Sequence, residues 1–195
     1  MALRPAVFLD KDGTVLRDIP YNVDPGLMDF APGARAGIAC LGGLGLPLIV
    51  VTNQPGVALG KFGIEALVAM RERLTQMFSE AGAELADLYF CPHHPDGGPA
   101  GHAGRCACRK PAPGLMLAAA RRHGLDLSRS WMVGDILDDV EAGRRAGCRT
   151  VLIDNGNETE WVMNAWRRPD CIAADFEEAG RLVAQHIRVR EESVP

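Results

Sequence analysis

A short apolar run followed at once by two aspartates constrains the fold of this chain more than any other stretch. Residues 6–9 read Ala-Val-Phe-Leu, and an uninterrupted apolar run of this length is typical of a strand buried on both faces. Asp10 and Asp12 follow, and Gly13 lets the backbone turn away from the strand direction. We therefore expect both carboxylates at the carboxyl end of the strand, where open α/β sheets bind their ligands. Such a pair can chelate a hard cation or serve as nucleophile and general acid/base; the alternative is a solvated acidic turn.

Size and composition set the wider limits. The chain has 195 residues, 47% of them apolar, which predicts one domain over residues 1–188 and a frayed tail over 189–195. A net charge of −4 argues against nucleic acid or an anionic membrane as a partner, and no apolar stretch approaches the ~20 residues of a membrane span. A strand starting at residue 6 leaves no room for a secretory signal, so we expect a cytoplasmic protein. Its six cysteines are then expected as metal ligands or buried thiols rather than disulfides.

Strand signals and helix signals alternate along the chain. Strands are expected over residues 6–9, 46–52, 84–90, 131–134 and 149–153, with a last edge strand over 171–174. Helices are expected over 34–44, up to about 80, over 113–123 and 138–146, and after Asp175, which with Glu178 forms an N-cap signature. The helix that ends near residue 80 has one apolar stripe: Ile64, Leu67, Val68, Leu74, Met77 and Phe78. This alternation predicts a three-layer, doubly wound α/β domain with a mostly parallel sheet.

The connections hold too few residues for a further domain. Residues 15–51 contain a loop, a helix and a strand, and residues 53–109 contain a helix, a strand and a loop rich in Cys and His. Neither interval can bury a core of its own, so we expect no separate cap domain over the site. Residues 154–170 are irregular, and their two tryptophans, Trp161 and Trp166, are expected to pack down as a flap.

Three further groups are expected at the same edge of the sheet, because the carboxyl ends of parallel strands meet there. Thr52 ends the second strand, Lys110 stands just before a helix, and Asp135 ends the fourth strand with Asp138 and Asp139 close by. Taken singly, Thr52 or Asp135 could cap a helix and Lys110 could be solvated. Taken together, a hydroxyl and an ammonium suit a phosphoryl group, and three carboxylates suit a divalent cation.

The chain resembles the haloacid dehalogenase (HAD) superfamily of phosphotransferases over residues 6 to about 155. Four motifs carry the resemblance, in this order: Asp10-x-Asp12-Gly13-Thr14, Thr52-Asn53, Lys110 and Gly134-Asp135. The resemblance implies that Asp10 is the nucleophile that accepts the phosphoryl group and that Asp12 is the general acid/base. It also implies that Thr52 and Lys110 hold the phosphoryl oxygens. Mg²⁺ would be bound by Asp10, by the backbone carbonyl of Asp12 and by Asp135.

Two other classes of protein, signalling receivers and zinc-stabilised binding modules, could carry similar side chains. A phospho-accepting signalling receiver also places acidic side chains, Mg²⁺, a Thr and a Lys on a doubly wound sheet. The order of the motifs fits the hydrolase better, and so does Asp12, because turnover of a phospho-enzyme needs a general acid/base. A zinc-stabilised binding module without catalysis would need a broken motif, and all four are intact.

Cysteine and histidine gather in residues 91–108, a loop without periodicity. The candidate metal ligands form two pairs, each with one intervening residue: Cys91 and His93, and Cys106 and Cys108. Three thiolates and an imidazole make a closed tetrahedral site, which predicts a structural Zn²⁺. His94 and His102 are competing ligands, and the alternative is a set of buried thiols and surface histidines. The remaining cysteines lie in apolar settings and are expected only to pack: Cys40, Cys148 and Cys171.

Within the superfamily, this loop and the Arg109-Lys110-Pro111 that follows it resemble one branch, which holds heptose-bisphosphate and histidinol-phosphate phosphatases. The length of the loop is more similar to the heptose enzymes. The likeness implies a pocket for a small sugar phosphate, lined by Asp18, Tyr21, Asn53, Gln54 and Arg109. It implies hydrolysis of the 7-phosphate of D-glycero-D-manno-heptose 1,7-bisphosphate; histidinol phosphate or another small-metabolite monophosphate is the alternative. A monomer is the default expectation for the oligomeric state.

Two positions depart from the pattern of the heptose enzymes. Ile136 stands where they usually carry a basic residue, and Leu59 stands where they usually carry arginine. Each lost cation removes charge-assisted hydrogen bonds to a second phosphate, worth about 1.5–3 kcal/mol each. Our hypothesis is that the enzyme prefers a monophosphate, or that Arg109 and Lys61 hold the second phosphate. An open site also admits a phosphorylated nucleic-acid end in principle, but the acidic balance argues against it.

Overall fold

Six parallel strands form one sheet in the computed structural model, which describes residues 3–98 and 104–192. In chain order the strands are β1 (Val7–Leu9), β2 (Leu48–Asn53), β3 (Leu85–Cys91), β4 (Trp131–Gly134), β5 (Arg149–Ile153) and β6 (Cys171–Ala173). Across the sheet their order is β3-β2-β1-β4-β5-β6, so the chain starts in the middle and winds outward in both directions. The predicted doubly wound α/β class is confirmed, with β6 at an edge.

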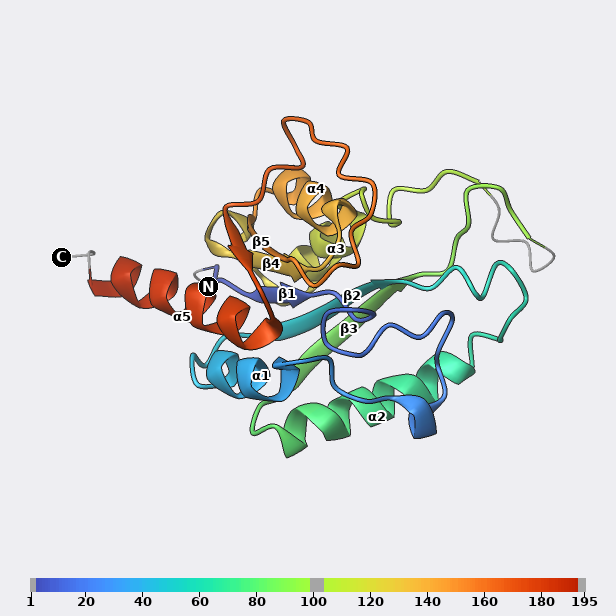
Figure 1. The fold of residues 1–195 in the computed structure, drawn as a ribbon, viewed down its shortest axis with the longest axis horizontal. Coiled ribbons are helices and arrows are strands. Elements are labelled where there is room, and N and C mark those ends of the chain that lie inside the picture. The colour runs from blue at the N-terminus through green and yellow to red at the C-terminus, as the bar shows by residue number, and fades with distance from the viewer. Residues whose placement is uncertain (1–2, 99–103, 193–195) are drawn as a thin grey trace.

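Helices cover both faces of the sheet (Figure 1). One face carries α1 (Ala34–Gly42), α2 (Ala66–Glu80) and α5 (Phe176–Glu192), and the other carries α3 (Gly114–His123) and α4 (Leu137–Ala146). The side chains of β1 alternate between the two cores: Val7 and Leu9 pack among residues of the first group, and Phe8 among residues of the second. All three are fully buried, as expected for a central strand covered on both faces.

The connections stay short. Between β1 and β2 the chain forms only the 3-10 turn η1 (Pro25–Leu27) and α1, and between β2 and α3 its described part forms α2 and β3. A second 3-10 turn, η2 (Leu127–Arg129), precedes β4. The described residues therefore contain no cap domain, as expected. Among them there is also no helix with the length and apolar character that crossing a membrane requires.

The buried stripe of α2 differs from the expected one. Ile64 and Val68 are 51% and 59% exposed, and Met70 is buried. Ile64 precedes the helix, which begins at Ala66, and Val68 lies about 100° around the helix from the buried Leu67. The stripe instead follows the i, i+3, i+4 spacing of Leu67, Met70, Leu74, Met77 and Phe78.

The expectation of a packed tryptophan flap is wrong. Trp161 and Trp166 are 44% and 49% exposed. The segment is held by polar contacts instead: the Arg167 guanidinium pairs with Asp138 at 2.6 Å and with Glu141 at 2.7 Å. Ion pairs to α4 fix this loop without burying its aromatic rings.

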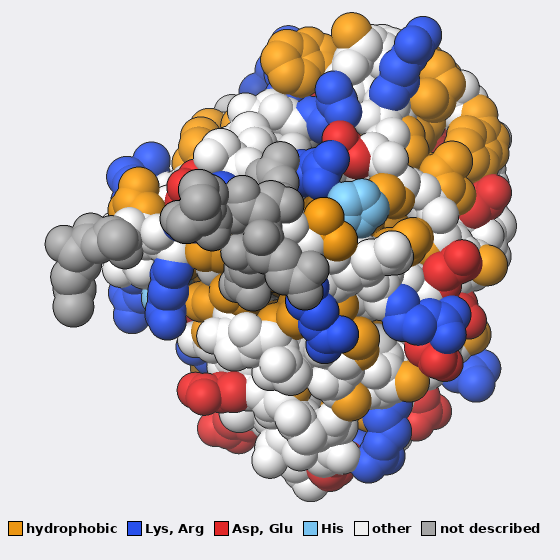
Figure 2. Space-filling model, turned by 90° about the vertical axis from the view of Figure 1, so that its left-hand side faces the viewer, with side chains coloured by type: hydrophobic (Ala, Val, Ile, Leu, Met, Phe, Trp, Pro, Cys, Tyr) orange, Lys and Arg blue, Asp and Glu red, His pale blue; other side chains and the backbone are white. Residues whose placement is uncertain are grey.

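The C-terminal helix begins as expected and ends later than expected. The Asp175 carboxylate accepts a hydrogen bond from Glu178 N at 2.8 Å, as the N-cap signature predicted. The helix then continues to Glu192, past residue 189, where the tail was expected to begin; residues 193–195 lie outside the described part. Helix α5 extends to the left of Figure 1, and Figure 2, which shows the molecule from that side, has acidic and basic side chains interspersed among apolar ones.

Candidate active site and metal centre

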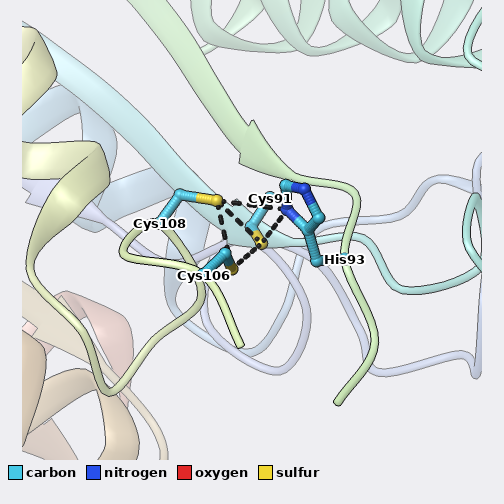
Figure 3. A group of neighbouring side chains, drawn as sticks. All are labelled: Cys91, His93, Cys106 and Cys108. Carbon is cyan, nitrogen blue, oxygen red and sulfur yellow. Dashed lines mark hydrogen bonds between the residues drawn. The ribbon is translucent and has the colours of Figure 1, made fainter. Parts of the chain in front are cut away.

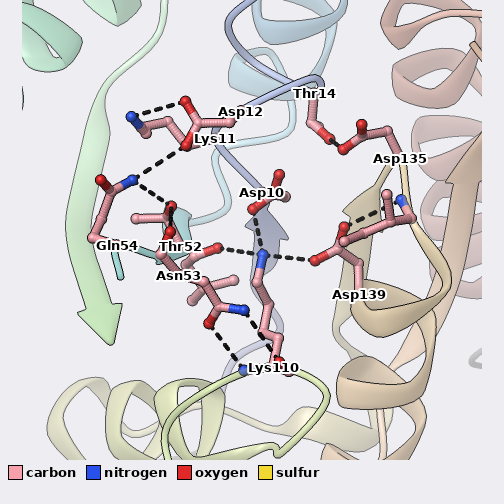
Figure 4. Close-up of polar contacts among 12 residues, drawn as sticks. Asp10, Lys11, Asp12, Thr14, Thr52, Asn53, Gln54, Lys110, Asp135 and Asp139 are labelled. Carbon is pink, nitrogen blue, oxygen red and sulfur yellow. Dashed lines mark hydrogen bonds and ion pairs between the residues drawn. The ribbon is translucent and has the colours of Figure 1, made fainter. Parts of the chain in front are cut away.

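The predicted site residues meet at the carboxyl edge of the sheet (Figure 4). Asp10 directly follows β1, and Thr52 is the next-to-last residue of β2. Lys110 precedes α3, and Asp135 directly follows β4. All four are at most 6% exposed. They line one cavity of about 230 Å³ with five neighbours, Asp12, Asp18, Asn53, Ile136 and Asn157. The four predicted residues, from Asp10 to Asp135, thus face one small volume although they lie far apart in the chain, as the parallel topology predicted.

Lys110 occupies the centre of this site. Its ammonium pairs with Asp10 and, at 2.6 Å, with Asp139, and it donates to Val51 O at 3.1 Å. Burial opposes the charge, but the two carboxylates dominate and raise the pKa of Lys110. The lysine is therefore a fixed cation beside the nucleophile candidate.

The backbone of Lys110 is held as firmly as its side chain. The Asn53 amide donates to Lys110 O at 3.1 Å and accepts from Lys110 N at 3.0 Å. This pair of hydrogen bonds ties the end of β2 to the loop before α3. Asn53 was expected only to line the pocket, and it does line it.

Asp12 lines the cavity, and each of its carboxylate oxygens contacts a neighbouring side chain. Lys11 Nζ lies 2.9 Å from Oδ1, and Gln54 Nε2 donates to Oδ2 at 3.2 Å and to Thr52 Oγ1 at 2.9 Å. Burial raises the pKa of Asp12 to about 6, with Lys11 opposing and Asp10 adding to the rise. A carboxyl group with a pKa in this range can both give and accept a proton near neutral pH.

Three carboxylates present oxygens to a common point. Oxygens of Asp10, Asp135 and Asp139 all lie within 4.8 Å of one another. Asp10 and Asp135 line the cavity and the fully buried Asp139 does not, so Asp10 and Asp135 are the two carboxylates available to a cation there. Burial and the neighbouring Asp10 raise the pKa of Asp135 to about 6, and hydrogen bonds from Asn157 and Thr14 oppose the rise. An all-oxygen donor set of this kind fits Mg²⁺.

A second cavity of about 280 Å³ adjoins the first and shares Asp12, Asp18 and Asn53 with it. Tyr21 and Gln54 also line it, so four of the five expected pocket residues are brought together. Arg109 lines neither of the two cavities: its guanidinium donates to His93 O at 3.5 Å, beside the Cys/His loop. Lys61 Nζ lies 5.8 Å from the centre of the ring of Tyr21, which lines this second cavity.

The Cys/His loop closes on itself (Figure 3). The four ligand atoms of Cys91, His93, Cys106 and Cys108 all lie within 4.8 Å of one another. Cys108 Sγ is 3.1 Å from Cys91 Sγ and 3.4 Å from His93 Nδ1. A closed group of three sulfurs and one imidazole nitrogen fits tetrahedral Zn²⁺ without an open position for substrate.

Two histidines were alternatives for this group. His94 Nδ1 accepts a hydrogen bond from Asp96 N at 3.3 Å, outside the cluster. His102 lies outside the described residues. Of the remaining cysteines, Cys148 is buried in the core and Cys40 and Cys171 are half-buried.

The sequence did not single out three residues of the site. Asp139 was noted only as a neighbour, and Asp138, next to it, faces Arg167 instead. Thr14 Oγ1 and Asn157 Nδ2 each donate to Asp135 at 2.7 Å, from opposite sides of its carboxylate. Thr14 belongs to a motif and could have been assigned, whereas Asn157 lies in an irregular loop with no pattern to mark it.

Comparisons with known proteins agree with this geometry. A family model described as "HAD-hyrolase-like" matches residues 107–179. The D-glycero-beta-D-manno-heptose-1,7-bisphosphate 7-phosphatase of Yersinia pestis is 37% identical over 170 residues, which are 83% of this chain and 90% of that protein. The enzyme of the same name from Vibrio cholerae is 37% identical over 150 residues, 77% of this chain and 81% of that protein.

Solved structures agree as well. A had-like phosphatase of Mesorhizobium loti has a TM-score of 0.81 at 35% identity and covers 97% of this chain and 88% of its own. The D,D-heptose 1.7-bisphosphate phosphatase of B. bronchiseptica, complexed with magnesium and phosphate, has a TM-score of 0.76 at 29% identity, over 93% of this chain and 99% of its own. On these relatives and on its fold, the chain belongs to the HAD-like phosphatases, a family of phosphoric monoester hydrolases.

Proposed function

We propose that this protein is a Mg²⁺-dependent phosphatase that hydrolyses a small sugar phosphate through a phosphorylated Asp10. The observation that carries the proposal is the single cavity into which Asp10, Thr52, Lys110 and Asp135 point, with Asp12 beside it. The named relatives act on heptose 1,7-bisphosphate. We therefore propose the 7-phosphate of D-glycero-β-D-manno-heptose 1,7-bisphosphate as the substrate, hydrolysed by a single-domain monomer.

The first half of the reaction transfers the phosphoryl group to Asp10. Its carboxylate attacks phosphorus, the bond to the sugar oxygen breaks, and Asp12 gives that oxygen a proton. Mg²⁺, held by Asp10, Asp135 and the backbone carbonyl of Asp12, would supply the positive charge that lets one anion approach another. In the second half, Asp12 takes a proton from water as the water attacks phosphorus and releases Asp10.

Two groups are available to hold the phosphoryl oxygens. Lys110 uses its three hydrogens on Asp10, Asp139 and Val51 O, so an arriving phosphoryl oxygen would replace Asp10 as an acceptor. Thr52 Oγ1 accepts from Gln54 and makes only a long 3.5 Å contact with Asn53 O, which leaves its hydrogen available. Both donors act where negative charge builds up in the transition state.

The rest of the substrate would lie in the second cavity, beside Asp18 and Tyr21. Hydroxyl groups of a sugar suit these partners, since a carboxylate accepts and a phenol can do both. Ile136 and Asn157 also line the first cavity, and neither is a cation. This favours the second candidate, a monophosphate; a bisphosphate would need a further cation, and Lys61, 5.8 Å from the centre of the Tyr21 ring, is the candidate.

Steady-state kinetics on a panel of phosphorylated metabolites with Mg²⁺ tests the proposal. The panel holds the heptose bisphosphate, the matching heptose monophosphate, histidinol phosphate and a phosphorylated oligonucleotide end. A large preference in kcat/KM for the bisphosphate would reject the monophosphate candidate. If the enzyme releases phosphate from none of the sugar phosphates, the proposed function itself is rejected.

A further inference from the structure

Each oxygen of the Asp135 carboxylate accepts one hydrogen bond from a neighbouring side chain. Oδ1 accepts from Thr14 Oγ1 and Oδ2 accepts from Asn157 Nδ2, each at 2.7 Å. Because the two donors stand on opposite oxygens, the carboxylate cannot rotate without breaking one of these hydrogen bonds. Each oxygen keeps a second lone pair, which remains free for a cation. The orientation of Asp135 is therefore set before any ligand arrives.

The Asn157 side chain comes from a loop that is tied to the site at several points. Asn155 Nδ2 donates to Gly13 O at 2.9 Å, and Asn155 Oδ1 accepts from Asn157 N at 3.1 Å. One residue further on, Glu158 Oε2 accepts from Leu137 N at 2.7 Å, at the start of α4. The loop after β5 is thus joined to the turn after β1, which follows Asp10, and to the start of α4, which follows Asp135.

Gly13 makes room for this contact. A Cβ atom at residue 13 would overlap both Asp135 Oδ2 and Asn157 Nδ2, and the backbone there has φ +83°, which L side chains rarely adopt. The hydrogen bond between Asn157 and Asp135 therefore lies in contact with the backbone of Gly13, in the turn that follows Asp10. A larger residue at position 13 would separate the two partners.

We propose that Asn157 is a positioning residue that fixes the Asp135 carboxylate for Mg²⁺, an inference that rests on the proposed function. A neutral amide is the suitable donor for this task. An ammonium at the same place would pair with Asp135 and compete with the cation, and a carboxylate would add repulsion to a site that already holds Asp10, Asp135 and Asp139. The amide orients the ligand and leaves its negative charge for the metal.

The variant Asn157→Leu tests this, because leucine has nearly the same size and no donor. Asn157 is exposed, so its replacement is not expected to disturb folding. The Kd for Mg²⁺, measured by calorimetry without substrate, is expected to rise about 10- to 100-fold, as is the Mg²⁺ concentration that gives half-maximal velocity. At saturating Mg²⁺, kcat is expected to stay within about threefold of wild type. Asn157→Gln, which keeps an amide donor, is expected to recover part of the lost affinity.

Asn164→Leu is the matched control. Asn164 lies in the same loop and accepts hydrogen bonds from Trp166 N at 2.7 Å and Arg167 N at 3.1 Å, away from Asp135. A wild-type Kd for Mg²⁺ in Asn157→Leu overturns the inference, and so does an equal loss in Asn164→Leu, which would mean that only folding of the loop matters. A wild-type protein that neither binds Mg²⁺ nor releases phosphate would instead reject the proposed function.

Discussion

The ammonium of Lys110 lies 2.6 Å from the carboxylate of Asp139, and both side chains are almost fully buried. Asp139 stands in the first turn of α4, and Lys110 also contacts Asp10. In the proposed reaction Asp10 exchanges its carboxylate charge for a bond to phosphorus, whereas Asp139 forms no bond to the substrate. Burial raises the pKa of Asp139, and the ammonium of Lys110 opposes the rise and favours the ion pair. Asp139 is therefore the permanent counterion that keeps Lys110 charged and in place, because an unpaired buried charge costs several kcal/mol.

Replacement of Asp139 by asparagine is expected to destabilise the protein and to slow the reaction. Loss of one partner from a buried pair lowers the free energy of unfolding by about 3–5 kcal/mol. Urea unfolding measures this loss, and kcat/KM measures the misplacement of Lys110. Asp138→Asn is the control, because Asp138 is the adjacent carboxylate but is one-third exposed and pairs with Arg167 outside the site. It is expected to cost less than about 1 kcal/mol; an equal or larger cost than that of Asp139→Asn would contradict this assignment.

Asp12→Asn is expected to slow both halves of the reaction with a sugar phosphate, and to stop turnover after the first chemical step when the leaving group needs no proton. The contacts from Lys11 and Gln54 hold the side chain in position, so the substitution removes proton transfer more than geometry. Loss of a general acid/base lowers kcat by about 10²- to 10⁴-fold. With p-nitrophenyl phosphate, whose leaving group needs no proton, the phosphorylated enzyme should accumulate and be visible by mass spectrometry. Asp29→Asn, an exposed aspartate in a loop, is the control; wild-type turnover in Asp12→Asn would assign the proton transfer to another group.

The strand ends of the site were predictable from sequence, because each lies at or directly after a buried apolar run. Asp10 and Asp135 follow β1 and β4, and Thr52 lies at the end of β2. Parallel topology then brings the three to one edge, since the strands of a parallel sheet all end on the same side. At these positions the apolar runs that predict strands agree with the strands of the sheet, so the predicted strand ends could be used to predict the site.

The roles of other residues depend on helix boundaries and side-chain contacts, which the pattern of apolar and polar residues does not show. Asp138 and Asp139 are adjacent, and only the residue at which α4 begins decides which of them faces Lys110. A shift of one residue turns a side chain by about 100°. Asn157 and the two exposed tryptophans lie in a loop whose course is set by side-chain hydrogen bonds and ion pairs, which have no period. Tertiary contacts of this kind decided the parts of the site and fold that the sequence left open or misplaced.

Strand β3, at one edge of the sheet, carries another buried carboxylate, that of Asp87. Asp87 accepts from Arg71 of α2 at 2.8 Å and contacts His123 of α3 at 2.9 Å, so helices from both faces meet around the edge strand. Burial opposes its ionisation, but hydrogen bonds from Leu88 N and His123 and the charge of Arg71 lower the pKa of Asp87. The ionised form is therefore the one that stabilises the fold.

Asp87→Asn is expected to lower the free energy of unfolding by about 1.5–3 kcal/mol at pH 7. Because the pKa of Asp87 is lower in the folded than in the unfolded protein, this contribution is fully present above the unfolded value near 4 and is lost as the pH falls through the folded value. Urea unfolding from pH 7 to pH 3 should show the gap between wild type and variant closing only below about pH 4. A gap that stays constant over this range would mean that Asp87 acts through its shape and not through its charge.

Zinc is expected at one ion per chain, and its removal is expected to loosen the loop that positions Lys110. Burial raises the pKa of the Cys91 and Cys108 thiols, so zinc binding must release protons and should weaken as the pH falls. Cys108→Ser removes one ligand two residues before Lys110; we expect it to lose zinc, to melt about 10 °C or more below wild type and to lose kcat/KM. Cys40→Ser, at a half-buried thiol in α1 outside the cluster, should keep the zinc content and the activity of wild type. Elemental analysis and thermal melting on the same samples check both variants, and a zinc-free wild type with an unchanged melting temperature would show that the loop holds its shape without metal.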